Sequence, residues 1–200
     1  SRLVHISTDY VFDGEGQRPY REDDPTGPIN AYGRSKLAGE EAVMREHPEG
    51  HLIVRVSWLF GPGGANFVET MLRLYGEGRR ELKVVDDQVG RPTYTFDLAR
   101  LLGTLLVKGS VGLFHAANGG AVAWRGFAEE VFRRAGLAEE VDIEPVPTSE
   151  YPTRAARPKR SVLDTSRVEA EAGRAMPPWQ DALGRYLKRA EAARSRAAGG

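Results

Sequence analysis

The sequence contains no cysteine, and this absence excludes disulfide bonds and thiolate chemistry. It also has no apolar run long enough to span a bilayer, and its first residues lack the basic and then apolar pattern of a signal peptide. Neither sign of charge is in excess, because Lys plus Arg and Asp plus Glu both number 28. No strong field therefore favours nucleic acid or a membrane surface, and we expect a cytoplasmic protein with neither as a partner.

Two kinds of ligand-binding pattern are also missing. The histidines lack the spacing of metal ligands, so we predict no metal site; they stand at positions 5, 47, 51 and 115. No Gly-x-Gly-x-x-Gly turn occurs, although a dinucleotide-binding domain uses one between its first strand and helix. The glycine-rich run at residues 61–64 has a different spacing, and we interpret it as a turn. The pyrophosphate of a dinucleotide would therefore lack its usual binding loop.

Short apolar runs alternate with helical patterns along most of the chain. Strands are predicted at residues 3–6, 52–57, 82–85 and 112–116. Helices are predicted at residues 31–46, 66–75, 95–107, 124–135, 165–173 and 179–193. We expect Thr95 to cap the third helix, and the prolines at positions 145, 147, 152 and 158 to interrupt regular structure. The alternation predicts the α/β class, with a parallel sheet and a smaller α/β cap.

Tyr32 and Lys36 lie four positions apart in the predicted helix 31–46. This spacing places both side chains on one face, one turn apart. A phenol is a poor acid at neutral pH, but an ammonium group within about 4–6 Å stabilises the phenolate and lowers its pKa. The two residues are therefore a candidate general acid with its activator. Taken alone the spacing has little weight, because surface helices contain many such pairs by chance.

Hydroxyl side chains follow the first predicted strand. Ser7 and Thr8 come directly after the apolar run 3–6, at the carboxyl end of a strand, where open α/β sheets bind their ligands. A Thr in this place can reach the reacting oxygen of a substrate. Ser and Thr also cap turns, so the local sequence leaves both interpretations open.

Four segments, taken in order, resemble one enzyme family. They are STDYVFDG at residues 7–14, NAYGRSKLAGE at 30–40, RVSWLFG at 55–61 and DQVGRPT at 87–93. The chain resembles the extended short-chain dehydrogenases, and within them the dTDP-4-dehydrorhamnose reductases, over residues 3–163. This resemblance implies the C-terminal part of a Rossmann-like parallel sheet with a smaller α/β substrate-binding domain. The chain would begin at the fifth parallel strand of such a domain, without the part that carries the glycine-rich turn.

The resemblance also implies a reaction. Such enzymes reduce the C4 keto group of a nucleotide-activated deoxysugar, dTDP-4-dehydrorhamnose to dTDP-rhamnose, in rhamnose and cell-surface polysaccharide biosynthesis. Tyr32 would donate the proton to the keto oxygen, while the cofactor, NADPH or NADH, supplies hydride. Lys36 would hold the nicotinamide ribose and lower the pKa of Tyr32, and Thr8 would hydrogen-bond the same oxygen. Ser7 is expected, with Tyr32 and Lys36, to contact the cofactor.

A substrate site is implied in the same way. The residues expected to contact the nucleotide sugar are Thr8, Asp9, Tyr10, Trp58, Gln88 and Arg91. Without the family pattern, Trp58 would be interpreted as a core aromatic residue after a strand. The basic run at residues 157–160 is either a phosphate-facing cluster or a solvated loop.

The resemblance predicts two structural portions. Residues 1–60 and about 90–120 would form the Rossmann portion with the catalytic residues, and residues 61–90 and about 121–190 the substrate-binding portion; residues 191–200 would be a frayed tail. Two alternatives stay open: a nucleotide-sugar epimerase, which uses the same Tyr and Lys, and a non-catalytic regulatory subunit of the same fold. A homodimer is compatible with the reductase and with the epimerase.

Overall fold

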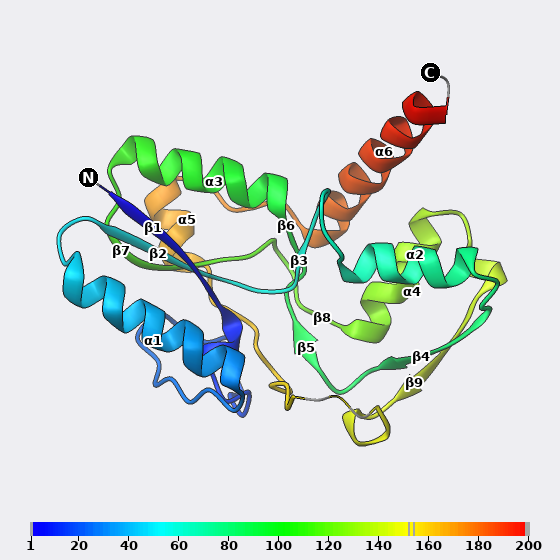
Figure 1. Ribbon diagram of the computed structural model, residues 1–200, viewed down its shortest axis with the longest axis horizontal. Helices are drawn as coiled ribbons and strands as arrows, with labels where there is room; N and C mark the ends of the chain where they lie inside the picture. Colours follow the sequence, from blue (N-terminus) through cyan, green and yellow to red (C-terminus); the bar gives the residue numbers. More distant parts are fainter. Residues whose placement is uncertain (1, 152, 154, 199–200) are drawn as a thin grey trace.

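A three-stranded parallel sheet forms one end of this computed structural model (Figure 1). Its strands are β1 (Leu3–Thr8), β2 (His51–Val56) and β7 (Gly112–Ala116), and they lie in the order β1-β2-β7. Both pairs are parallel, so all three strands end at the same edge of the sheet. That edge is where an open α/β sheet binds ligands.

The two faces of the sheet are covered by different helices (Figure 1). Side chains alternate between the faces along each strand. Leu52 and Val54 of β2 join an apolar cluster with α3 (Thr95–Lys108) and α5 (Ser166–Ala172). The intervening residues of the strands face α1 (Ala31–Glu46), which packs on β1 and β2. The sheet is thus the middle of three layers.

A second layered unit lies beyond the carboxyl edge of the sheet (Figure 1). It contains the parallel pair β4 (Glu81–Val85) and β9 (Asp142–Val146). The helices α2 (Phe67–Gly76), α4 (Trp124–Arg134) and α6 (Trp179–Ala198) share an aromatic core with these strands. The side chains that form this core include Phe60, Tyr94, Phe127, Phe132, Trp179 and Tyr186.

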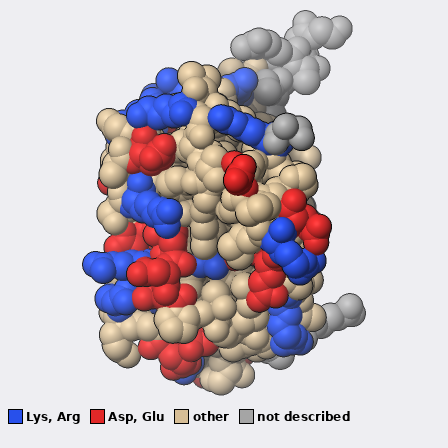
Figure 2. Space-filling view, turned by 90° about the vertical axis from the view of Figure 1, so that its left-hand side faces the viewer, with Lys and Arg blue, Asp and Glu red and all other residues tan. Residues whose placement is uncertain are grey.

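Short strand pairs complete the fold. The parallel pair β3 (Leu59–Phe60) and β6 (Thr93–Tyr94) follows β2, and the antiparallel pair β5 (Val89–Gly90) and β8 (Val122–Ala123) precedes α4. Three single 3-10 turns are η1 (Asp9–Val11), η2 (Ala138–Glu140) and η3 (Thr148–Glu150). On the face that Figure 2 presents, acidic and basic side chains are interspersed.

The predicted α/β class with a Rossmann-like parallel sheet is confirmed. The helix predicted at 31–46 and the strand predicted at 112–116 have the observed boundaries. The capping prediction for Thr95 is wrong: Tyr94 is the N-cap of α3, without a side-chain hydrogen bond, and Thr95 is the first helical residue. The Thr95 hydroxyl instead fills the space beside Gly61, where a Cβ would lie 1.9 Å from its oxygen.

The expectation that prolines interrupt regular structure after residue 144 is wrong for β9. Pro145 lies inside this strand, opposite Val84 of β4. In the described residues this strand pairs with β4 alone. Asp142 N donates to the Arg80 carbonyl, and the Val146 carbonyl accepts from Asp86 N. The proline nitrogen therefore faces away from the ladder, as proline requires in an edge strand.

One helix of the C-terminal part contacts the first sheet, and the division into two portions stays a prediction. The helix α5, which falls within the predicted substrate-binding range 121–190, packs on β7 and α3 of the first sheet. The helix α6 continues to Ala198, past the predicted end at residue 193. The structure describes residues 2–151, 153 and 155–198, with side chains as far as residue 192, so Ser1, Pro152, Arg154 and the last two residues of the predicted tail lie outside it.

Candidate active site

The carboxyl end of β1 leads directly into a buried polar turn. Thr8 caps η1: its Oγ1 accepts a hydrogen bond from Tyr10 N at 3.2 Å and donates to Asp9 Oδ1 at 3.0 Å. Thr8 and Asp9 are both buried. The capping interpretation of the Thr8 hydroxyl is therefore confirmed, and its contact with the reacting oxygen of a substrate stays a prediction.

The first turn of α1 presents Tyr32 to solvent. The helix begins at Ala31 because Asn30 caps it, with Oδ1 accepting from Gly33 N at 2.8 Å. The Tyr32 side chain is 55% exposed, and its ring lies edge-on to that of Tyr10, with centroids 5.9 Å apart. Thr8 and Tyr32 therefore both contact Tyr10, and the catalytic triad stays a prediction.

Lys36 follows one turn later on the same helix and is half-buried. Burial and then the Lys36 ammonium lower the pKa of His5, so the positive charge lies near β1. The Tyr10 hydroxyl is unsuited to proton transfer, because burial and the neighbouring Asp9 raise the Tyr10 pKa to about 12. Tyr32 is thus the tyrosine at this edge that is open to a substrate.

Gly33 allows the helix and the strand end to meet. A Cβ built on Gly33 would lie 2.1 Å from the Tyr10 carbonyl oxygen and 2.9 Å from the Pro28 side chain. No side chain fits in that space, so α1 contacts η1 backbone to backbone. The glycine inside the Tyr-x-x-x-Lys pattern is the local reason that Tyr32 lies beside Tyr10.

Asp9 is a buried carboxylic acid with two hydroxyl partners. The Ser161 hydroxyl donates to Oδ2 at 2.5 Å, and Thr8 donates to Oδ1. Burial raises the pKa of Asp9 to about 7, although these hydrogen bonds oppose the shift. An uncharged carboxyl group at this place can both donate and accept hydrogen bonds to a sugar hydroxyl.

We expect Asp9→Asn to make the protein relatively more stable as pH rises from 4 to 7. The folded protein keeps Asp9 protonated in this range while the unfolded chain ionises it, so the parent loses roughly 1.4 kcal/mol of stability per pH unit, an effect that levels off above the folded pKa. Urea unfolding of both proteins across this range measures the difference.

Asp13→Asn is the control, because the effect of this carboxyl on stability should have the opposite sign and should appear below about pH 4, where the urea series is extended. Hydrogen bonds from Glu15 N and the Tyr20 hydroxyl lower the pKa of Asp13. The Asp13 carboxylate therefore stabilises the fold above its usual pKa, and this stabilisation is lost as pH falls through its lowered pKa. A stability difference between the parent and Asp9→Asn that does not change with pH would contradict a raised Asp9 pKa.

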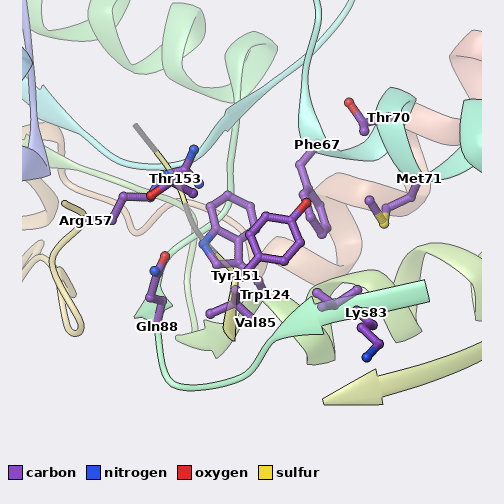
Figure 3. A pocket seen from close by; sticks show the side chains of 11 residues that line it. Phe67, Thr70, Met71, Lys83, Val85, Gln88, Trp124, Tyr151, Thr153 and Arg157 are labelled. Atoms are coloured by element: carbon purple, nitrogen blue, oxygen red, sulfur yellow. The ribbon is translucent and has the colours of Figure 1, made fainter. Parts of the chain in front are cut away.

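A cavity of about 280 Å³ is lined by side chains of α2, β4 and α4 and of the segments that follow β4 and β9 (Figure 3). Aromatic side chains form part of its wall, and two cations and an amide lie around it. The residues that line it are Phe67, Thr70, Met71, Lys83, Val84, Val85, Gln88, Trp124, Tyr151, Thr153 and Arg157. Arg157 lines the cavity, and its positive charge lowers the pKa of Tyr10, although burial and Asp9 raise that pKa by more.

Gln88 belongs to the cavity and to the loop that shapes it. The side chain is buried, and its Nε2 donates to Thr148 Oγ1 at 2.9 Å. Thr148 also donates to Asp87 Oδ1, through its backbone N at 2.9 Å and its hydroxyl at 2.6 Å. The DQ segment therefore holds the turn that leads to Tyr151 and Arg157.

Trp58 is half-buried and stacks on Trp124, with ring centroids 3.5 Å apart and planes 5° from parallel. Its backbone has a φ of 45°, which is a strained conformation for a residue other than glycine. Gly90 leaves room for the indole, since a Cβ there would lie 2.4 Å from the ring. One face of Trp58 thus covers an aromatic residue of the cavity wall; contact of Trp58 with a sugar stays a prediction.

Two predicted site residues have other partners here. The Ser7 hydroxyl is buried and donates to Glu40 Oε1. Arg91 is not among the cavity residues: its Nε donates to the Asn118 carbonyl at 2.9 Å and its Nη1 to the Leu163 carbonyl at 2.7 Å. Burial lowers the pKa of Arg91. These contacts join chain segments, and contact of Ser7 with the cofactor and of Arg91 with the nucleotide sugar stays a prediction.

The cavity contains residues that the sequence did not indicate. Tyr151, Thr153 and Lys83 are examples, and none of them belongs to a segment that resembled the family. Among the described residues, no group of three His, Asp or Glu side chains could hold a metal ion. No described helix combines the length and apolarity needed to cross a membrane.

The fold and this site define a class of protein. A hydroxyl residue ends a parallel strand, and the adjacent helix carries an exposed Tyr with a Lys one turn later, as in short-chain dehydrogenase-type proteins. Residues 1–192 match the family model of the RmlD substrate binding domain, and the chain belongs to this family.

Individual relatives agree with that membership. The spore coat polysaccharide biosynthesis protein SpsK of Bacillus subtilis is 46% identical over 94% of this chain and 64% of its own length. A dTDP-4-dehydrorhamnose reductase of Streptomyces griseus is 46% identical over 90% of this chain and 60% of its own. A solved dTDP-4-dehydrorhamnose reductase of Bacillus anthracis, in complex with NADP, is 41% identical, with a TM-score of 0.89 over 94% of this chain and 66% of that one. The chain spans less than two thirds of the two curated relatives.

Proposed function

We propose that the enzyme containing this chain reduces the C4 keto group of a nucleotide-activated deoxysugar with NADPH or NADH. The substrate would be dTDP-4-dehydrorhamnose and the product dTDP-rhamnose, as the names of the relatives suggest. The observation that carries the proposal is the exposed Tyr32, whose ring contacts Tyr10 in the turn that Thr8 caps at the carboxyl end of β1. The reaction would serve cell-surface polysaccharide synthesis in the cytoplasm.

The chain's own residues supply the acid. The Tyr32 hydroxyl donates its proton to the keto oxygen, and solvent can restore the proton because the side chain is exposed. Thr8, at the end of β1, holds the same oxygen by a hydrogen bond. Asp9, with its raised pKa, lies next to Thr8 and would contact a sugar hydroxyl.

The donor set at this edge fits the ribose end of a nicotinamide cofactor. A phenol hydroxyl and an ammonium group one helical turn apart can hydrogen-bond a ribose, so Tyr32 and Lys36 would hold it. The cofactor supplies the hydride that goes to C4. Within this chain no Gly-x-Gly-x-x-Gly turn is available for its pyrophosphate.

The cavity suits the nucleotide part of the substrate. Arg157 and Lys83 offer positive charge for a diphosphate, and the aromatic side chains of Trp124, Tyr151 and Phe67 offer faces for a base (Figure 3). Of the two interpretations of the basic run 157–160, this position favours a phosphate-facing Arg157. Gln88, Trp58 and Tyr10 would complete the contacts to the sugar.

A substrate comparison tests the proposal. With dTDP-4-dehydrorhamnose we expect stoichiometric loss of NADPH or NADH absorbance and formation of the C4 alcohol. An epimerase would instead change the sugar configuration without net consumption of cofactor, and a regulatory subunit would show neither reaction. Turnover of a keto acid or a simple ketone alone would contradict the substrate assignment.

A further inference from the structure

The helix that carries Tyr32 and Lys36 is attached to the sheet by a buried ion pair. Arg55 of β2 donates to Glu40 of α1 through Nε, 2.9 Å from Oε1, and through Nη2, 2.7 Å from Oε2. The side chains are 4% and 0% exposed. Among the ion pairs of the described residues, this is the one in which both partners are buried.

The pair belongs to a row of polar side chains that crosses the sheet below the catalytic edge. Ser7, Arg55 and His115 are neighbours in register on β1, β2 and β7, and all three face α1. The Ser7 hydroxyl donates to Glu40, so the residue that precedes Thr8 is tied to the same carboxylate.

His115 enters this row as a neutral acceptor. Burial, and then the Arg55 charge, lower the pKa of His115 to about 3. Its Nδ1 lies 3.1 Å from the Tyr20 carbonyl and therefore carries the ring proton, which leaves Nε2 to accept from Arg55 Nη1 at 3.4 Å. The Arg55 guanidinium also lies over the Phe12 ring, 5.0 Å from its centroid. Arg55 thus has partners on every side.

The position of Glu40 along α1 gives the pair its consequence. Glu40 follows Lys36 by four residues and Tyr32 by eight, so all three project from one stripe of the helix. Gly33 sets the contact of the first turn, and Glu40 sets a second contact two turns later. Two fixed contacts determine both the direction of the helix and its rotation.

We propose that Glu40 and Arg55 are positioning residues, whose pairing sets the rotation of α1 and thereby places Tyr32 and Lys36 relative to Thr8. This inference rests on the proposed function of Tyr32. A buried ion pair is often replaceable by apolar residues without loss of stability. Replacing the pair by apolar residues would then remove its effect on the placement of α1 and leave the stability of the fold largely unchanged.

The decisive variant replaces both charges together. We expect Glu40→Met with Arg55→Met to melt near the parent temperature, while kcat falls about 100-fold, as a misplacement of about 1 Å can cause. The KM for the sugar nucleotide should stay within about threefold, because the cavity is formed by other residues. A kcat within about twofold of the parent in this folded variant would overturn the proposal.

Glu40→Gln should show the opposite order of effects. The amide keeps the shape of the carboxylate and can still bond Ser7 and Arg55, so kcat should stay within about threefold. It leaves the Arg55 charge without its counter-charge, so the melting temperature should fall clearly. A purely structural pair would lose activity and stability together. Arg73→Gln with Glu77→Gln, an exposed pair on α2, is the control expected to change neither.

Ser7→Ala decides the question if the double methionine variant does not fold. Loss of one hydroxyl should lower kcat about tenfold without raising the KM for NADPH. An unchanged kcat would overturn the inference, and a raised KM with unchanged kcat would instead mean that Ser7 holds the cofactor.

A readout without turnover separates this inference from the proposed function. Tyr10 and Tyr32 are close enough for nuclear Overhauser contacts between their rings in selectively labelled protein. These contacts should persist in Glu40→Gln and weaken in the double methionine variant. If they weaken while the parent fails to reduce the sugar nucleotide, the proposed function is wrong and the positioning role stands. If they are unchanged in the double methionine variant, the positioning role is wrong.

Discussion

Tyr32→Phe is expected to lower kcat by about 10²–10⁴-fold, which is the usual contribution of a positioned general acid. The substitution removes the hydroxyl that would protonate the keto oxygen and keeps the ring that contacts Tyr10. The KM for the sugar nucleotide should change little, because the cavity residues are untouched. Steady-state kinetics with dTDP-4-dehydrorhamnose and NADPH measure both constants.

The fold should be spared. The Tyr32 side chain is more than half exposed, and its hydroxyl has no hydrogen bond to the described residues, so the melting temperature should match that of the parent. Tyr75→Phe is the control, since it removes an exposed hydroxyl bonded to Glu140, far along the chain from the site. Activity of Tyr32→Phe within about a factor of two of the parent would contradict the acid assignment.

The part of this site that could be predicted from sequence consists of short local patterns. The helix α1 was predictable to the residue because Asn30 caps it and His47-Pro48 ends it. Thr8 and Tyr32 were indicated by a strand end and a helical spacing, and each has a local signature. The α/β class with a parallel sheet followed from the alternation of strands and helices, and the Rossmann-like assignment followed from the family resemblance, which the family membership supports.

What could not be predicted depends on contacts between distant segments. Tyr151 and Thr153 line the cavity because Asp87 and Gln88 hold the turn at Thr148, and no local pattern records that contact. The strand β9 was missed because a proline such as Pro145 normally argues against a strand. A proline is tolerated here because β9 is an edge strand.

Arg91 shows that a motif does not reveal the contacts of a residue, and its contact with the nucleotide sugar stays a prediction. The motif identified the position, but the partners of its guanidinium, the carbonyls of Asn118 and Leu163, come from segments 27 and 72 residues away. Glu40 shows the reverse. A charged residue in a helix is normally expected to be exposed to solvent. Glu40 is buried and paired because β1 and β2 place Ser7 and Arg55 side by side beneath it.

Gly33→Ala is expected to lower kcat about 100-fold. This loss is unusual for a glycine-to-alanine change inside a helix. Alanine usually stabilises a helix by about 1 kcal/mol relative to glycine. At position 33 its Cβ would lie 2.1 Å from the Tyr10 carbonyl oxygen, so α1 must move by more than 1 Å or the turn after Thr8 must yield. Either movement separates Tyr32 from Thr8, and the crowding should destabilise the fold by about 1–3 kcal/mol.

Two other helical glycines serve as controls that separate the effect of the Gly33 contact from the effect of helix propensity. Gly103→Ala in α3 meets no atom within 4 Å and should stabilise the protein without changing kcat. Gly39→Ala lies on α1 itself, but its Cβ meets the His5 ring at 3.1 Å, which a small side-chain shift relieves. If Gly33→Ala retained kcat while these two behaved as expected, the contact at Gly33 would not place Tyr32. A loss confined to Gly33→Ala would locate the requirement at the backbone contact between α1 and η1, where the acid meets the strand end.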